Sequence, residues 1–220
     1  MKHRRPAIPN ELQTIYYLSG RQNLSQNLRQ KFRQLQRGFL GELAFHQLLK
    51  KQKFSSPTSL FSLTLQVGEN LFQIDHLVII GEVIYVHEIK HFKGDFHFKN
   101  NLFFSLQNNR EIVSPIVQLK RAESLLRQLL SSLGLSYKVV SKVVFTHPEC
   151  AIFTDNLQLP ILLLPQVKRY IENTLIPDYS PTQHNIELAK KLVDLHQTET
   201  IFDQAIQVSY DHLEKGINCP

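Results

Sequence analysis

The chain has 220 residues, enough for one ordinary α/β domain with extensions and for a sizeable hydrophobic core. Hydrophobic residues make up 42% of the chain and charged residues 20%, a composition that argues against wholesale disorder. No apolar run approaches the roughly 20 residues of a membrane-spanning helix, and no apolar segment follows the basic N-terminus as it would in a secretory signal. Two cysteines are too few for a disulfide framework, so we expect a protein of the reducing cytoplasm.

The net charge of +6 is concentrated at the N-terminus. Residues 1–36 contain seven lysines and arginines and a single acidic residue, Glu11, so this arm carries 7 − 1 = +6. The rest of the chain balances, with 18 basic and 18 acidic residues. A basic arm of this kind suits contact with nucleic acid phosphates or with an anionic membrane surface. A solvated helical face would explain the same pattern, so both interpretations stay open.

The first part of the chain has helical patterns. Residues 1–8 indicate a flexible basic tail, and Pro9-Asn10 is expected to begin a helix that ends near Ser19, before Gly20. Residues 24–35 have apolar side chains at the spacing of a helical stripe: Leu24, Leu28, Phe32 and Leu35.

Two glycines follow this stripe. We expect Gly38 and Gly41 to interrupt the helical pattern before a further helical stretch, residues 42–49. Residues without side chains at these two positions would let another backbone pack closely or let a ligand approach.

Strand patterns come next. Residues 59–67 alternate, which predicts a strand with Phe61, Leu63, Leu65 and Val67 on one face. Two apolar, β-branched runs, residues 72–80 and 83–90, are joined by Gly81-Glu82. Glycine at the first position of a two-residue loop is what a type II′ hairpin turn requires, so these runs predict a hairpin.

The remaining elements complete an α/β pattern. Their order fits a mixed central sheet flanked by helices. The elements are a hairpin over 95–106 around Asn100-Asn101, a helix from Ser114-Pro115 to near Gly134, a strand at 137–145, a short edge strand at 161–164, and helices at 166–174, 182–196 and 200–215.

The predicted hairpin brings charged residues together. If Ile80 lies opposite Val83, Asp75 lies opposite Glu88, and Gln73 lies opposite Lys90 on the same face. Directly opposed carboxylates repel each other, and the commonest reason to keep such a pair is a hard divalent cation. The nearby positions of that face are apolar and therefore at least partly covered, namely Leu77, Ile79, Ile84 and Val86. An Asp, a Glu and a Lys on one patch of sheet make a plausible phosphodiesterase site.

The same residues resemble a known family. Asp75 followed by Glu88-Ile89-Lys90 is similar to the PD-(D/E)XK nuclease signature. Together with Gly38-Phe-Leu-Gly41-Glu42 and Gln73-Ile-Asp75-His76, it resembles the NERD (nuclease-related) domain over about residues 37–150. The resemblance implies a restriction-endonuclease-like α/β fold with a mixed central sheet flanked by helices. Residues 1–36 would then be a basic helical extension and residues 151–220 a mainly helical one.

The resemblance also implies roles for individual residues. Lys90 would position and activate the attacking water and stabilise the charge that builds on the phosphate. Mg²⁺, with Mn²⁺ as an alternative, would be held by Asp75, Glu88, Glu42 and the carbonyl of Ile89. Gln73 and Gln118 are the candidate substrate contacts. The plainer alternatives are a helix-surface role for Glu42, an ion pair with Glu88 for Lys90, and an ordinary strand amide for Gln73.

We therefore predict a metal-dependent nuclease, with DNA favoured over RNA as its substrate. The other candidate is a nucleic-acid-binding or regulatory adaptor that keeps the fold but does little chemistry. All three core residues, Asp75, Glu88 and Lys90, are present, which favours the enzyme.

A zinc-protease pattern overlaps this site. Residues 87–91 satisfy HExxH, and Glu111 lies downstream as a conceivable third ligand. The motif works on a helix, where residues four apart share one face. Here it lies in a β-branched run, and on a strand His87 and His91 would be roughly 13 Å apart, at ~3.3 Å per residue. We therefore do not expect a zinc protease.

Overall fold

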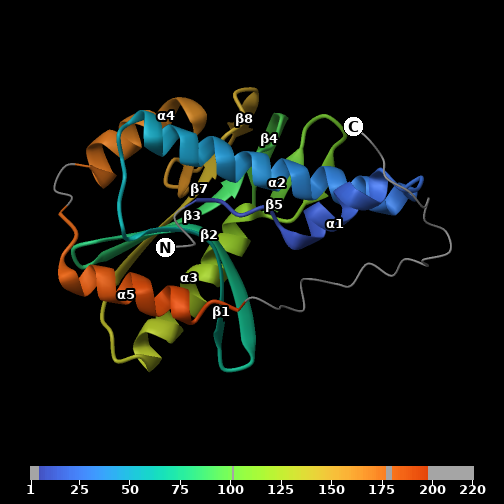
Figure 1. Cartoon of the computed structure of the whole chain (residues 1–220). Coiled ribbons are helices and arrows are strands. Elements are labelled where there is room, and N and C mark those ends of the chain that lie inside the picture. The colour runs from blue at the N-terminus through green and yellow to red at the C-terminus, as the bar shows by residue number, and fades with distance from the viewer. Residues whose placement is uncertain (1–4, 101, 177–179, 198–220) are drawn as a thin grey trace.

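The computed structural model describes residues 5–100, 102–176 and 180–197, which form an α/β fold with two mixed sheets flanked by helices (Figure 1). In the first sheet, the first three strands are antiparallel neighbours and the last three are parallel. Its strands, in spatial order, are β1 (Ser59–Val67), β2 (Asn70–Ile80), β3 (Val83–Lys90), β7 (Lys138–Phe145) and β9 (Ile161–Leu163). The second sheet contains β6 (Arg110–Ile112), β5 (Leu102–Ser105), β4 (Gly94–Lys99) and β8 (Cys150–Phe153).

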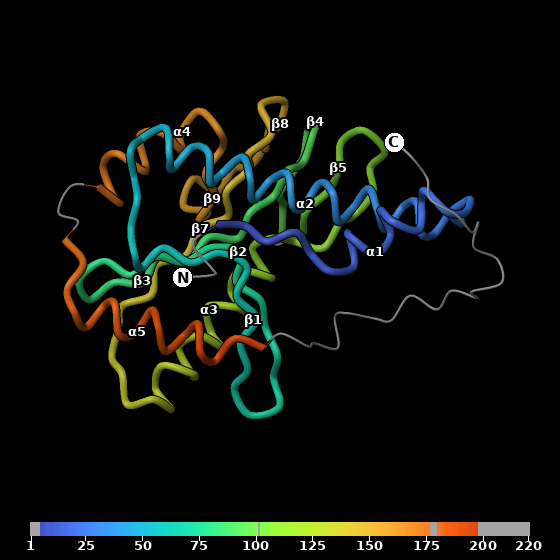
Figure 2. Tube along the Cα trace, in the orientation of Figure 1, coloured from blue at the N-terminus to red at the C-terminus, as the bar shows by residue number. Residues whose placement is uncertain are grey.

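Helices cover both faces of the first sheet. The helices are α1 (Asn10–Ser19), α2 (Gln26–Lys51), α3 (Pro115–Ser132), α4 (Leu164–Tyr170), its π-helical continuation η2 (Ile171–Leu175), and α5 (Gln183–Asp194). Figures 1 and 2 show α2 and α4 on one face and α3 and α5 on the other. Helix α1 packs against α2. Within the described ranges, none of the helices is long and apolar enough to cross a membrane.

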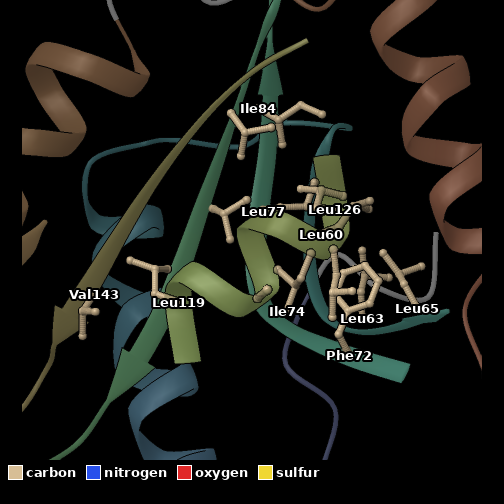
Figure 3. Packing of buried hydrophobic residues seen from close by; sticks show 14 of the residues in the cluster. Leu60, Leu63, Leu65, Phe72, Ile74, Leu77, Ile84, Leu119, Leu126 and Val143 are labelled. Carbon is tan, nitrogen blue, oxygen red and sulfur yellow. The ribbon is translucent and has the colours of Figure 1, made fainter. Parts of the chain in front are cut away.

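Each face of the sheet has its own hydrophobic cluster. The larger cluster fills the space between the sheet and helices α3 and α5, and Figure 3 shows Leu119 and Leu126 packed over residues of β1, β2 and β3. The smaller cluster lies under α2, where Phe45 and Leu49 pack with side chains of the sheet and of α4 and η2. Both clusters are needed because the sheet is apolar on its two faces, as strands covered on both sides are.

Most of the predicted elements are confirmed. Strand β1 has the predicted bounds, α1 and α3 begin and end where expected, and the hairpin pairs Ile80 with Val83 across Gly81. Gly81 has φ +55°, as the first position of a type II′ turn requires. Strands β6 and β8 were not predicted. The expected helix at 200–215 and residues 1–4 of the expected tail lie outside the described residues.

The predicted break at Gly38 and Gly41 is wrong, because α2 runs through both glycines without interruption. Gly41 is buried, and a Cβ there would lie 3.0 Å from Cβ of His91, so this glycine lets α2 approach the end of β3. A glycine within a helix costs about 1 kcal/mol relative to alanine. Burial of Phe45 and Leu49 offsets that cost. The expected boundary between residues 36 and 37 therefore falls inside one helix.

The predicted face of β1 is also wrong at one residue. Phe61 lies in the cluster under α2, whereas Leu63 and Leu65 lie in the cluster under α3. The cause is Ser62, whose φ of +51° interrupts the alternation of side chains within the strand. Partner residues continue in the same register on both sides of Ser62, so the strand is turned locally without an inserted residue.

Candidate active site

The site begins where β2 and β3 part. The last paired residues of the hairpin are His76 and His87, and one position further the same register sets Asp75 against Glu88. The backbone ladder has ended there, and Oδ2 of Asp75 instead accepts a hydrogen bond of 2.7 Å from the N–H of Ile89. The carboxylate of Asp75 thus closes the fork between the two strands.

Strand β3 contributes a lysine and a second carboxylate. Residues two apart on a strand share a face, and Nζ of Lys90 lies 2.6 Å from Oε1 of Glu88. The two side chains are 19% and 13% exposed, so solvent reaches both only in part. Along its whole length β3 also pairs in parallel with β7, which sets Glu88 opposite Val143 and Lys90 opposite Phe145.

Helix α2 contributes the third carboxylate. Glu42 follows the close approach at Gly41, and its Oε2 accepts a hydrogen bond of 2.7 Å from Oγ of Ser62. Ser62 is the strand residue with positive φ, and it lies opposite Asp75 in the register of β1 and β2. Sequence reasoning missed Ser62, because nothing in an alternating strand indicates a left-handed residue.

The charges of these groups are unbalanced. Burial raises the pKa of Asp75 well above its usual range, and the charges of Glu88 and Glu42 raise it further, against the opposing effects of Lys90 and the Ile89 N–H. Burial likewise raises the pKa of Glu42 to about 7, although its bond from Ser62 acts in the other direction. Three carboxylates share one ammonium group, so an added cation would be stabilised here.

The donor chemistry fits a hard divalent ion. Carboxylate oxygens are the ligands that Mg²⁺ takes, and it commonly uses one or two of them while keeping several waters. Across the described ranges, no three His, Cys, Asp or Glu side chains are grouped closely enough to hold a metal together. A Mg²⁺ site of one or two carboxylates and water does not require such a group.

A buried hydrogen-bonded chain lies next to the site on the α2 side of the sheet. Nδ1 of His76 and Nδ1 of His87 are 2.8 Å apart, and their Nε2 atoms contact Ser59 Oγ and Tyr170 Oη, each at 2.9 Å. Phe45 packs against both imidazoles with ring centroids 5.2 Å away. Burial lowers the pKa of both histidines, that of His87 to about 3, so both are neutral. The hairpin register could have identified this pair, because it places His76 opposite His87.

The positions of the HExxH residues exclude the zinc-protease arrangement. His87 is fully buried in β3, while His91 lies beyond the strand and its Nδ1 is 2.9 Å from Oγ1 of Thr146. Glu111 is exposed on β6, in the other sheet.

The two predicted glutamines are not brought to the site. Gln73 is exposed and lies opposite Thr64 of β1. It does not lie opposite Lys90, because the pairing of β2 with β3 ends at His76 and His87. Gln118 is exposed in α3, and among the described residues its side chain has no hydrogen bond to a site residue. The structure therefore groups Glu42, Asp75, Glu88 and Lys90, and leaves substrate contacts by the glutamines as predictions.

Two mixed sheets flanked by helices, with acidic groups and a lysine where two central strands part, are the arrangement expected of a nuclease-type α/β domain. The model of the family described as "Nuclease-related domain" (NERD) matches residues 37–146, half of the chain. The chain belongs to the NERD family, which is part of the PD-(D/E)XK-like superfamily.

Other comparisons are distant. Among solved structures, the chain is similar to protein VC1899 from Vibrio cholerae, with 13% identity and a TM-score of 0.35. The match covers 84% of this chain and 52% of that protein, so this chain spans about half of its length. No curated protein matches significantly.

Proposed function

We propose that this protein is a Mg²⁺-dependent nuclease that hydrolyses phosphodiester bonds, with DNA favoured over RNA. The observation that carries the proposal is the group of three carboxylates and one lysine in a chain of the NERD family, with the pKa values of Asp75 and Glu42 raised. Groups that repel one another at the cost of stability are typical of sites built for charged ligands.

The metal would be held by Asp75 and Glu88 and by the carbonyl oxygen of Ile89, and Glu42 would bind it through a water molecule. When bound, Mg²⁺ supplies a Lewis acid that polarises a phosphoryl oxygen and lowers the pKa of a water molecule. Mn²⁺, which also takes oxygen ligands, should substitute for it.

Lys90 would act on the water and on the phosphate. Its ammonium group donates hydrogen bonds, and one of its partners is already the Glu88 carboxylate at 2.6 Å. From that position, Lys90 would orient the attacking water and stabilise negative charge that develops in the transition state. Glu88 would hold Lys90 in place between turnovers.

A second candidate is a nucleic-acid-binding adaptor with little catalysis. The observation that favours it is that, in the described part of the chain, no three potential ligands lie close enough to share one ion. Both candidates bind nucleic acid, so only a cleavage measurement separates them.

The deciding experiment measures cleavage of single-stranded DNA, double-stranded DNA and RNA with Mg²⁺, with Mn²⁺ and with EDTA. Cleavage should require the metal. Lys90→Ala should lower kcat by roughly 10² or more and leave substrate binding nearly unchanged, because the lysine acts mainly in the transition state.

The matched control is Lys93→Ala, which removes an exposed lysine three residues away that pairs with exposed Glu149. This variant should cut like the wild type. Nucleic acid binding without metal-dependent cleavage would support the adaptor, and full activity in Lys90→Ala would overturn the proposed mechanism.

A further inference from the structure

The exposed face in the N-terminal half of α2 has an unusual composition. From Gln26 to Gly41 the helix contains no acidic residue. Residues four apart lie on one side of a helix, and two such rows run beside each other along the exposed face. All six side chains are exposed: Arg29, Arg33 and Arg37 in one row, and Gln26, Gln30 and Gln34 in the other.

These arginines are available to a ligand. Nε of Arg29 donates to the carbonyl of Leu24, and its terminal N–H groups have no hydrogen bond to any residue in the described ranges. Arg33 and Arg37 form no ion pair with any residue that the structure describes. Lys31, by contrast, pairs with Glu11.

Gly38 supplies an independent observation. It continues the glutamine row, it is exposed, and a Cβ added to it would meet nothing within 4 Å. Within the part of the chain that the structure describes, no packing contact therefore accounts for a residue that weakens the helix. A glycine with open space above it leaves the helix backbone accessible to a ligand. The next residue in the same row, one turn further on, is Glu42.

We propose that this face, the α2 track, binds the phosphodiester backbone of a nucleic acid strand and guides it over Gly38 to the active site. Successive arginines rise by about 6 Å along the helix, and Gln26 and Glu42 are about 24 Å apart along it, at 1.5 Å per residue. Arginine contacts phosphate, and the glutamine amides add neutral hydrogen-bond donors. The inference rests on the proposed function, since it assigns the substrate path of the same site.

The test measures binding of fluorescent single-stranded DNA, double-stranded DNA and single-stranded RNA in EDTA over a range of salt concentrations. The triple variant Arg29→Gln, Arg33→Gln, Arg37→Gln should bind more weakly. The slope of log K against log salt should fall by roughly 2–3, because each phosphate contact contributes ~0.7–0.9. The substrate class whose slope changes most identifies the strand that the track binds.

The matched control removes three exposed lysines from the opposite face of the sheet: Lys120→Gln in α3 with Lys190→Gln and Lys191→Gln in α5. Its salt slope should equal that of the wild type. Gly38→Gln adds no charge and is tolerated in an exposed helix, so it should weaken binding at an unchanged or higher Tm.

Two results overturn the inference while leaving the proposed function intact. They are a triple variant that binds and cuts like the wild type, and one whose loss of binding is matched by the lysine control. A wild-type protein that neither binds nor cuts nucleic acid would instead overturn the proposed function, and the track with it.

Discussion

Asp75 has two opposing roles in the folded chain. Its Oδ2 closes the fork between β2 and β3 by accepting the Ile89 N–H, and its charge is repelled by Glu88 and Glu42. An asparagine keeps an acceptor for the Ile89 N–H and removes the charge. The substitution therefore separates the structural role of this side chain from its electrostatic one.

We expect Asp75→Asn to melt at or above the Tm of the wild type in EDTA, because it relieves a buried repulsion. A ligand that binds only the folded state raises Tm with its concentration, so the wild type should gain Tm with Mg²⁺ and Asp75→Asn should gain little. Thermal melts with EDTA, Mg²⁺ and Mn²⁺ check this. A variant that melts lower in EDTA and still responds fully to Mg²⁺ would show that Asp75 is not a ligand.

At the scale of single elements, α2 combines the most functional positions. It carries the α2 track, the close approach at Gly41 and the carboxylate of Glu42, all on one uninterrupted helix. A rigid helix holds these groups at fixed separations, which a flexible basic arm could not do. Deleting residues 1–36 would cut α2 within its first half, so point substitutions are the proper test of its charge.

Substituting Gly38 and Gly41 of α2 by alanine should have opposite effects on the stability of the protein. Gly38→Ala should stabilise the protein by about 0.5–1 kcal/mol, because alanine is the better helix former and a Cβ there meets open space. Gly41→Ala should destabilise it, since its Cβ would lie 3.0 Å from the Cβ of His91 and α2 would have to move from β3. Urea denaturation of both variants measures the difference. Equal effects would show that α2 does not approach β3 at Gly41.

Local sequence patterns predicted an element correctly where a single feature, such as a turn glycine, was enough to determine it. The register of the hairpin followed from Gly81, and it brings Asp75 close enough to Glu88 for their charges to interact just beyond the last paired residues. Prediction failed where distant contacts decided the outcome. The continuity of α2 accompanies the burial of Phe45 and Leu49, and Ser62, the left-handed residue of β1, donates a hydrogen bond to Glu42, 20 residues away. Gln73 was predicted to lie opposite Lys90, and this was wrong because β2 and β3 separate at a point that no local sequence pattern indicates.

At the scale of the whole molecule, stability should depend on pH through two opposing pairs. His76 and His87 have lowered pKa values in the folded state, so below about 6.5 the unfolded chain binds protons that the folded chain does not. This pair therefore loses stability as the pH falls. Glu42 and Asp75 have raised pKa values, that of Glu42 about 7, so at mildly acidic pH the folded chain binds protons that the unfolded chain does not, and this pair gains stability as the pH falls.

The two effects oppose each other between about pH 6.5 and pH 4.5, the range in which both pairs differ from the unfolded chain, so the wild type should depend on pH less than either pair would alone. The double variant Glu42→Gln, Asp75→Asn leaves only the histidines. Its free energy of unfolding should fall by up to about 1.4 kcal/mol per pH unit for each histidine below about pH 6.5. Urea denaturation at several pH values without metal measures this. A variant with the same pH dependence as the wild type would contradict the opposing pairs.

The left-handed residue in β1 affects more than the carboxylate that it contacts. Strand β1 supplies Phe61 to the layer under α2 and both Leu60 and Leu63 to the layer under α3, and the interruption at Ser62 decides on which side Leu63 lies. Neither layer can come apart without disturbing the strand that the other packs on. The two layers should therefore unfold as one cooperative unit, with the helix that carries Glu42 kept in register with the sheet until the whole domain opens.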